Sequence, residues 1–262
     1  MCIRDRLYRK RLWDGVNFND ERLMWTPVIS TKLNRYIKEL TIQHPDSIIA
    51  SSKFLIDQVL DKPEYLKYFA NWVTLQYEPT KTTLMDAEAV YVNMIKNYFT
   101  NEHAFWADSV TIFGLQKRAY EMGSSLVGQQ GPDVISKDLS GKELSIYGMK
   151  SDYIIVYMFN PDCEHCAVET PKLVANYNNW KAQGIDVYGI AIDTEVPKLD
   201  AYIKKNQIPF NVVYDPSNRS IYAKYYVNVT PEVYVLNKQR KIIGKNLNID
   251  QVMTIIDRDR KG

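Results

Sequence analysis

Apolar residues recur at helical spacing along the first half of the chain. Behind Thr26-Pro27, a pair typical of a helix start, apolar side chains return every three or four positions, at Ile29, Leu33, Tyr36 and Ile37. The same period predicts four further helices. Three are expected to begin near Pro45, Asp61 and Asp108, and one carries Val90, Tyr91, Met94, Ile95 and Tyr98 on its apolar stripe. Thr26 and Asp61 are the expected caps of their helices, and the first half is predicted to be all-α.

Four of the five tryptophans lie in the same half, at Trp13, Trp25, Trp72 and Trp106. They follow the apolar stripes, which favours the core of a helix bundle over the alternative, an aromatic substrate groove. The last of the five predicted helices is expected to turn Val110, Phe113 and Leu115 inward.

Continuous apolar runs alternate with helical patterns in the second half. Residues 153–159 and 185–192 have the pattern of strands buried on both faces, and a helical pattern over 163–183 separates them. Further strands are expected at 210–213, 232–236 and 241–245, with helices at 196–206, at 217–225 and behind a cap at Asn248. This alternation predicts a layered α/β/α fold behind the all-α region.

A segment rich in helix breakers separates the two patterns, with Gly123, Gly128, Gly131 and Pro132 close together. We therefore expect a helical domain over residues 1–127 and an α/β domain over 128–262. The chain opens on charged residues without the apolar core of a signal peptide. Residues 1–15 are accordingly expected to be disordered, or to reflect an artificial or truncated start.

The composition and charge of the chain exclude some classes of protein but do not identify a function. Of 262 residues, 45% are hydrophobic and 24% are charged, which is ordinary for a globular protein. The net charge is +2 and the two signs balance in each half, which argues against nucleic-acid binding. No apolar stretch approaches the ~18 residues that a transmembrane helix needs.

The candidate chemistry lies in Cys163-Glu164-His165-Cys166, between a strand pattern and a helix pattern. At a helix N-terminus, unpaired N–H groups and the helix dipole favour a thiolate on Cys163, and Cys166 follows one turn later, within reach of a disulfide. A structural zinc site also uses this spacing, but it normally needs four ligands and the chain offers no second Cys or His pair. Two buried cysteines without a role are the third interpretation. The setting favours a redox pair that needs no metal or other cofactor.

From about Gly128 onwards, the chain resembles the thioredoxin superfamily and, within it, thiol-disulfide oxidoreductases of the TlpA/ResA type. The resemblance rests on a hairpin pattern over residues 131–145, on the cysteine motif with Pro171 in the helix behind it, and on Thr230-Pro231 before a strand. It implies a thioredoxin-like fold and a cis Thr230–Pro231 bond. The loop at Thr230 and Pro231 would then lie against the cysteines and bind extended substrate.

Two positions depart from the superfamily's pattern. Asp162 stands where Trp often precedes the first cysteine, and Tyr157 stands where thioredoxin carries a buried aspartate. The acid–base role must therefore lie elsewhere. The resemblance assigns it to Glu169, which would take the proton of Cys166 as this thiol attacks a mixed disulfide. A solvated helix glutamate without a role is the alternative.

Charged neighbours are expected to tune the pair. His165 can support the Cys163 thiolate, whereas Asp162 and Glu164 place negative charge beside it. These influences act on the reduction potential in opposite directions, so the sequence leaves the direction of electron flow open.

Three functions compete on the sequence. The favoured one is a dithiol oxidoreductase that acts on protein disulfides or dithiols and exchanges electrons with an upstream redox partner. A thiol peroxidase would need Thr three residues before its peroxidatic cysteine, where this chain has Asn160. A binding module with a vestigial redox site is the third, against which the intact cysteine pair, Glu169 and Thr230-Pro231 argue. The family resemblance implies a location in the cell envelope, on its periplasmic side.

Overall fold

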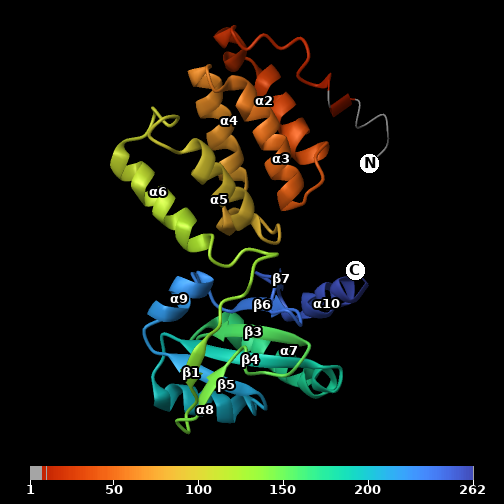
Figure 1. Cartoon of the computed structure of the whole chain (residues 1–262), viewed down its shortest axis with the longest axis vertical. Coiled ribbons are helices and arrows are strands. Elements are labelled where there is room, and N and C mark those ends of the chain that lie inside the picture. Colours follow the sequence, from red (N-terminus) through yellow and green to blue (C-terminus); the bar gives the residue numbers. More distant parts are fainter. Residues whose placement is uncertain (1–7, 10, 262) are drawn as a thin grey trace. The chain divides into compact units, whose positions relative to one another are not determined.

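The chain forms two compact units, Met1–Tyr120 and Glu121–Gly262, in a computed structural model that describes residues 8, 9 and 11–261 (Figure 1). The sequence placed the boundary later, after Val127. The breaker segment lies in the second unit because it hydrogen-bonds there: the Gly128 N–H donates to the Ile242 carbonyl oxygen at 2.8 Å.

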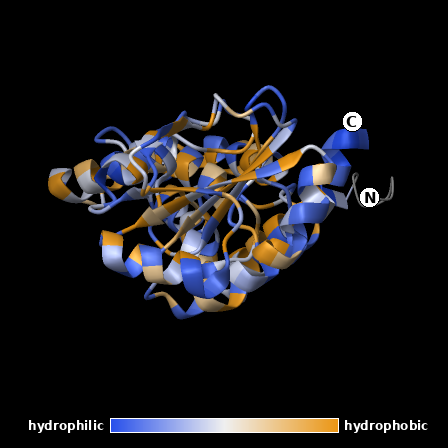
Figure 2. Ribbon diagram, turned by 90° about the horizontal axis from the view of Figure 1, so that it is seen from below, coloured by the Kyte–Doolittle hydropathy of each residue, from blue (hydrophilic) through white to orange (hydrophobic). Residues whose placement is uncertain are grey.

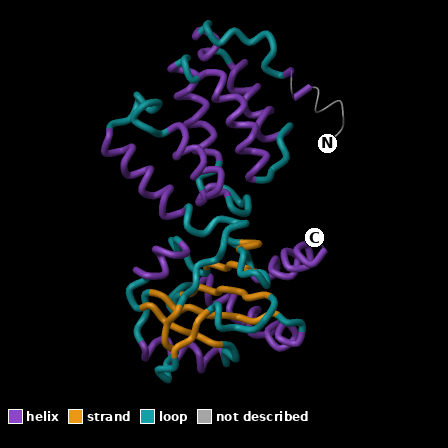
Figure 3. The backbone as a smooth tube through the Cα atoms, viewed as in Figure 1, coloured by secondary structure: helices purple, strands orange, loops and turns teal. Residues whose placement is uncertain are grey.

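The described part of the first unit consists of helices and loops (Figure 3). Its elements are η1 (Glu21–Trp25), α2 (Pro27–Asn34), η2 (Arg35–Glu39), α3 (Pro45–Ile56), η3 (Asp57–Val59), α4 (Pro63–Gln76), η4 (Pro79–Lys81), α5 (Ala87–Tyr98) and α6 (Ser109–Met122), which ends just past the division. Thr26 caps α2 as predicted, since its side chain accepts a hydrogen bond from the Val28 N–H. The predicted cap Asp61 is wrong, because Pro63 takes the first position of α4 and Lys62 becomes the cap.

The tryptophans contribute less to the core than their spacing predicted. Trp13 is 5% exposed, Trp72 and Trp106 are half-buried, and Trp25 is 90% exposed. The prediction for α6 was also wrong in phase: Val110 and Phe113 are exposed and Leu115 is half-buried. The buried residues of α6 instead include Ile112, Ala119 and Met122. Two apolar stripes run along this helix, and periodicity alone does not say which one packs.

The start of the chain is more ordered than predicted where it is described. Residues 1–7 and 10 lie outside the described residues, but Leu12 and Trp13 are both buried, so the expected disorder is wrong for residues 11–15. The Trp13 ring packs edge-on against Phe69 and Tyr36, with centroids 5.6 and 5.9 Å away. Such aromatic pairs stabilise a fold by more than the burial of their apolar area alone.

The second unit is built on a five-stranded sheet in the order β5-β4-β3-β6-β7. β3 (Tyr153–Phe159), β4 (Ile185–Ile192) and β5 (Asn211–Asp215) are parallel, while β6 (Glu232–Leu236) and β7 (Ile242–Gly244) run antiparallel to their neighbours. A separate hairpin pairs β1 (Ile135–Lys137) with β2 (Glu143–Ser145). The helices are α7 (Glu164–Ala182), α8 (Val196–Asn206), α9 (Arg219–Tyr225) and, behind η5 (Ile249–Gln251) with its cap Asn248, α10 (Val252–Lys261).

The central strand β3 is buried along its whole length, as its continuous apolar run predicted. Ile154, Val156 and Met158 pack into one core cluster, and the alternate positions Tyr157 and Phe159 point to the face where α7 and α8 lie. Figure 2 shows the strands of the sheet as mostly hydrophobic. The cysteine motif follows directly at the carboxyl end of β3. No helix in the described part of the chain has the length and apolar character to cross a membrane.

The burial of Trp13 leads to a prediction about stability. Trp13→Ala should lower the free energy of unfolding of the first unit by about 3–5 kcal/mol, because it removes a buried aromatic side chain. Trp25→Ala is the matched control and should change it by less than ~0.5 kcal/mol. Urea unfolding of the full chain measures both, and equal effects of the two variants would contradict the packing described for Trp13.

Candidate active site

The active-site loop is fixed by hydrogen bonds to the end of β3. The Asn160 side chain accepts the Asp162 N–H at 2.8 Å, and the Asn160 carbonyl oxygen accepts the Cys163 N–H at 3.1 Å. Cys163 is the N-cap of α7 and Cys166 lies in its first turn. The short loop therefore presents one sulfur at the helix end and carries the other inside.

The two sulfurs occupy different environments. Cys163 is partly exposed, whereas Cys166 is fully buried, and the two are not joined by a disulfide in this structure. The Cys166 N–H donates to the Cys163 sulfur at 3.3 Å, as a cap residue's side chain accepts from the first turn. The Cys163 sulfur also lies 3.1 Å from the Thr230 carbonyl oxygen, to which its S–H can donate.

These environments move the two thiol pKa values apart. Burial raises the pKa of Cys163. The opposite effect is larger, because its sulfur is hydrogen-bonded by the side chains of Cys166 and Thr230 and by the N–H groups of Cys166 and His165. The pKa of Cys163 therefore lies below the ordinary value. Burial, together with the hydrogen bond with Cys163, raises the pKa of the Cys166 thiol to about 12. The predicted difference in exposure, with Cys163 partly exposed and Cys166 buried, is confirmed. The role of Cys163 as the nucleophile stays a prediction.

The Thr230–Pro231 peptide bond is cis, which confirms the expectation from the sequence. The loop before β6 does lie against the cysteine pair, since Thr230 contacts the Cys163 sulfur. Its role in binding substrate stays a prediction.

Charged side chains surround the motif on its exposed side. Lys198 of α8 pairs with Asp162 at 2.7 Å, which offsets the negative charge that the sequence placed beside Cys163. Glu164 and His165 are exposed on the first turn of α7. Lys198 also lines a pocket of about 330 Å³ with Asp193, Thr194, Glu195 and Pro216, so this surface beside the motif is hollowed.

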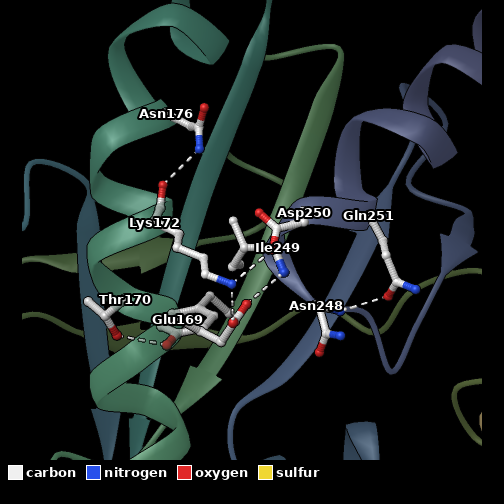
Figure 4. Close-up of polar contacts among 9 residues, drawn as sticks. Glu169, Thr170, Lys172, Asn176, Asn248, Ile249, Asp250 and Gln251 are labelled. Carbon is white, nitrogen blue, oxygen red and sulfur yellow. Dashed lines mark hydrogen bonds and ion pairs between the residues drawn. The ribbon is translucent and has the colours of Figure 1, made fainter.

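Glu169 lies between α7 and η5 (Figure 4). One carboxylate oxygen pairs with Lys172 at 2.9 Å, and the other accepts the Ile249 N–H at 2.8 Å. Its side chain is only 14% exposed, so the alternative of a solvated glutamate is wrong. No described hydrogen bond joins Glu169 to either sulfur, and its acid–base role stays a prediction.

Below Cys166 the structure places three hydroxyl groups that sequence reasoning did not assign to the site. Tyr157 of β3, Thr170 of α7 and Tyr202 of α8 are hydrogen-bonded in a row that ends on the Cys166 carbonyl oxygen. The helical spacing from Cys166 to Thr170 was a signal for one of them. Tyr202 comes from a helix 36 positions later, and no local pattern connects it to the motif.

The described residues contain no group of three or more His, Cys, Asp or Glu side chains arranged to hold a metal ion. What the site offers is a dithiol with one accessible and one buried sulfur. Such a pair can carry out thiol-disulfide exchange.

Comparisons with known proteins find similarity in the second half of the chain. Residues 127–245 match the AhpC/TSA family model. The chain is 22% identical over 116 residues to thiol-disulfide oxidoreductase ResA of Bacillus subtilis (strain 168), which covers 44% of this chain and 64% of that protein. It is 30% identical over 93 residues to the chloroplastic peroxiredoxin Q of Populus jackii, which covers 35% of this chain and 43% of that protein. The chain thus spans less than two thirds of either relative.

The crystal structure of a thioredoxin-like protein from Bacteroides caccae ATCC 43185 has the same fold, with a TM-score of 0.74 and 18% identity over 97% of this chain and 92% of that one. The second half is a thioredoxin-like α/β domain that follows a helical region, as the sequence predicted.

The two environments predict a pH dependence. Alkylation of the reduced protein by iodoacetamide should occur at Cys163, and its rate should rise with pH around a midpoint below that of an ordinary cysteine, ~8.5. Cys166 should stay unmodified through neutral pH, because its thiolate is scarce there. Peptide mapping by mass spectrometry assigns each site, and preferential modification of Cys166 would contradict the asymmetry.

Proposed function

We propose that this protein is a thiol-disulfide oxidoreductase that exchanges two electrons with protein disulfides or dithiols through Cys163 and Cys166. The single observation that carries the proposal is the difference between the two sulfurs within one helical turn. The Cys163 sulfur accepts a hydrogen bond from an N–H group at the helix end, and Cys166 is buried behind it. The resemblance to proteins named thiol-disulfide oxidoreductase supports the reaction class.

In the reducing direction, the Cys163 thiolate attacks one sulfur of a substrate disulfide. The other substrate sulfur leaves as a thiolate, and a mixed disulfide joins Cys163 to the substrate. Cys166 then loses its proton and attacks the Cys163 sulfur. The Cys163–Cys166 disulfide forms, the second substrate thiolate leaves, and the substrate has gained two electrons. The reverse sequence oxidises a substrate dithiol.

Turnover in the reducing direction needs a dithiol reductant that returns two electrons to the Cys163–Cys166 disulfide, which is the upstream redox partner in this scheme. We place the reaction in the cell envelope, on the periplasmic side, because the motifs of the second half resemble the TlpA/ResA type. Thr230 beside the Cys163 sulfur supports a docking role, since an extended substrate segment held there would bring its sulfur to Cys163.

Thiol peroxidase is a second candidate, supported by the partial match to a peroxiredoxin. The residue three positions before Cys163 is Asn160, and its side chain is engaged by the Asp162 N–H and the Asp193 carbonyl oxygen. Asn160 thus serves to hold the loop. Consumption of hydrogen peroxide that depends on Cys163 and exceeds the rate of disulfide exchange would favour the peroxidase.

Trapping of mixed disulfides tests the assignment of the two sulfurs. Cys166→Ser should accumulate covalent complexes with substrate proteins, because attack by Cys163 survives and release is lost. Cys163→Ser should trap few or none. Mass spectrometry of complexes that a reductant dissolves identifies them. Equal trapping by both variants would overturn the roles proposed here.

Glu169 is proposed to accept the proton of Cys166 during the second attack. It lies one helical turn beyond Cys166, and the position that could hold another carboxylate is Tyr157. Glu169→Gln should therefore slow resolution of a mixed disulfide on the order of a hundredfold near neutral pH, a typical effect of losing a general base.

Rapid-mixing kinetics of the Glu169→Gln variant measure the resolution step directly. Glu143→Gln, on an exposed position of β2, is the matched control for loss of a carboxylate. If both variants resolve at the rate of the unmodified protein from pH 6 to 8, Glu169 serves only to tie α7 to η5 through its bond with Ile249.

A further inference from the structure

Three buried hydroxyl groups form a continuous row beneath the resolving cysteine. The Tyr157 and Thr170 oxygens are 2.7 Å apart, the Thr170 and Tyr202 oxygens are 2.7 Å apart, and the Tyr202 hydroxyl lies 3.1 Å from the Cys166 carbonyl oxygen. Thr170, Tyr157 and Cys166 are fully buried and Tyr202 nearly so. No water molecule is needed to complete these hydrogen bonds.

The end of the row fixes its direction. A carbonyl oxygen only accepts, so the single proton of Tyr202 must be donated to Cys166. Tyr202 can then bond to Thr170 only as an acceptor, so the Thr170 hydroxyl donates its proton to Tyr202. Thr170 can in turn bond to Tyr157 only as an acceptor, so the Tyr157 hydroxyl donates its proton to Thr170. All three protons therefore point the same way along the row, from Tyr157 towards the Cys166 carbonyl oxygen.

We propose that this one-way row makes Tyr202 a positioning residue for the redox pair: by committing the Tyr157 proton elsewhere, it withholds a hydrogen-bond donor from the Cys166 sulfur and so keeps Cys166 a neutral thiol until a substrate is bound to Cys163. This builds on the dithiol exchange proposed above. A neutral resolving thiol does not compete for the substrate disulfide, and it attacks only when a base removes its proton.

The surroundings of the row support this role. The Phe159 ring stacks on Tyr157 at 5.3 Å and on Tyr202 at 5.4 Å, which fixes both phenols. Cys166 and Thr170 are four residues apart on α7, so their side chains share one face of the helix, and the Tyr157 hydroxyl bonded to Thr170 lies on that face too. Burial raises the pKa of Tyr157 and of Tyr202, so both phenols stay protonated.

Other ionisable groups lie on the elements around Cys166. Besides the two phenols, they include Cys163, Glu164, His165 and Glu169 at or near the start of α7, and Glu232 on β6, whose carboxylate accepts the Asn246 N–H at 3.0 Å. The exposed Asp162–Lys198 pair lies nearby. Each is unchanged in the variants below, so differences among these variants report on the row.

Tyr202→Phe should reverse the row. Without Tyr202 as acceptor, Thr170 can donate to Tyr157, and the Tyr157 proton becomes available to the Cys166 thiolate. A hydrogen bond to a charged group should lower the pKa of Cys166 by about one unit. The thiolate fraction of Cys166 then rises about tenfold near neutral pH. A thiolate of lower pKa is a weaker nucleophile, which lowers the rate of attack about threefold. The net expectation is resolution about three times faster.

The experiment rapidly mixes the reduced full chain carrying Cys2→Ser, which leaves Cys163 and Cys166 as its two thiols, with dithionitrobenzoate. Attack by Cys163 releases one coloured thiolate, and attack by Cys166 on the resulting mixed disulfide releases the second, so the second phase measures resolution. Tyr202→Phe should speed the second phase about threefold between pH 6 and 8. The double variant Tyr157→Phe/Tyr202→Phe should lose this gain, because the proton that was freed is no longer there.

Tyr177→Phe is the control, since it removes a buried phenol of α7 that bonds to Asp186 instead of the row. It should leave the second phase unchanged. A second phase that is unchanged or slower in Tyr202→Phe, or a gain that persists in the double variant, would overturn the proposal. The probe is a small disulfide, so this outcome is independent of whether protein substrates are trapped through Cys163.

Discussion

The first turn of α7 imposes opposite conditions on two sulfurs that lie three residues apart. The N-cap position gives Cys163 an N–H donor at 3.3 Å and partial access to solvent, and the same turn carries Cys166 into the layer between α7, α8 and the sheet. This arrangement requires the buried strand β3, the loop held by Asn160 and the turn at Thr230. The rest of the domain serves to hold these pieces in register.

Three hydroxyl groups lie behind the pair. Where thioredoxin carries a buried aspartate, this chain has Tyr157, and Thr170 and Tyr202 complete a row of hydroxyls that satisfy one another. A buried charge at this place would be costly and would interact strongly with a thiolate. The hydroxyls avoid that cost, and Glu169, the carboxylate proposed as the base, lies at the edge between α7 and η5.

Much of the second unit could be predicted from sequence because its signals are local. The run that became β3 is apolar without interruption, and those that became β4 and β6 are apolar apart from Asp186 and Glu232. The cysteine motif and Thr230-Pro231 fall at fixed points between these strands. The first unit was harder, since α6 carries two apolar stripes and Trp25 lies on no buried face. Contacts between distant segments gave no sequence signal at all. Tyr202 under Cys166, Lys198 at Asp162 and the Ile249 N–H at Glu169 depend on tertiary packing.

The central claim is that Cys163 and Cys166 act as one two-electron couple. A redox titration tests it directly, with the full chain carrying Cys2→Ser equilibrated against buffers of reduced and oxidised dithiothreitol and its thiols counted by alkylation and mass. The account predicts that the two thiols disappear together, with the ratio of oxidised to reduced protein changing tenfold for every ~30 mV. Thiols that are lost one at a time, or that pair only between two copies of the chain, would contradict it.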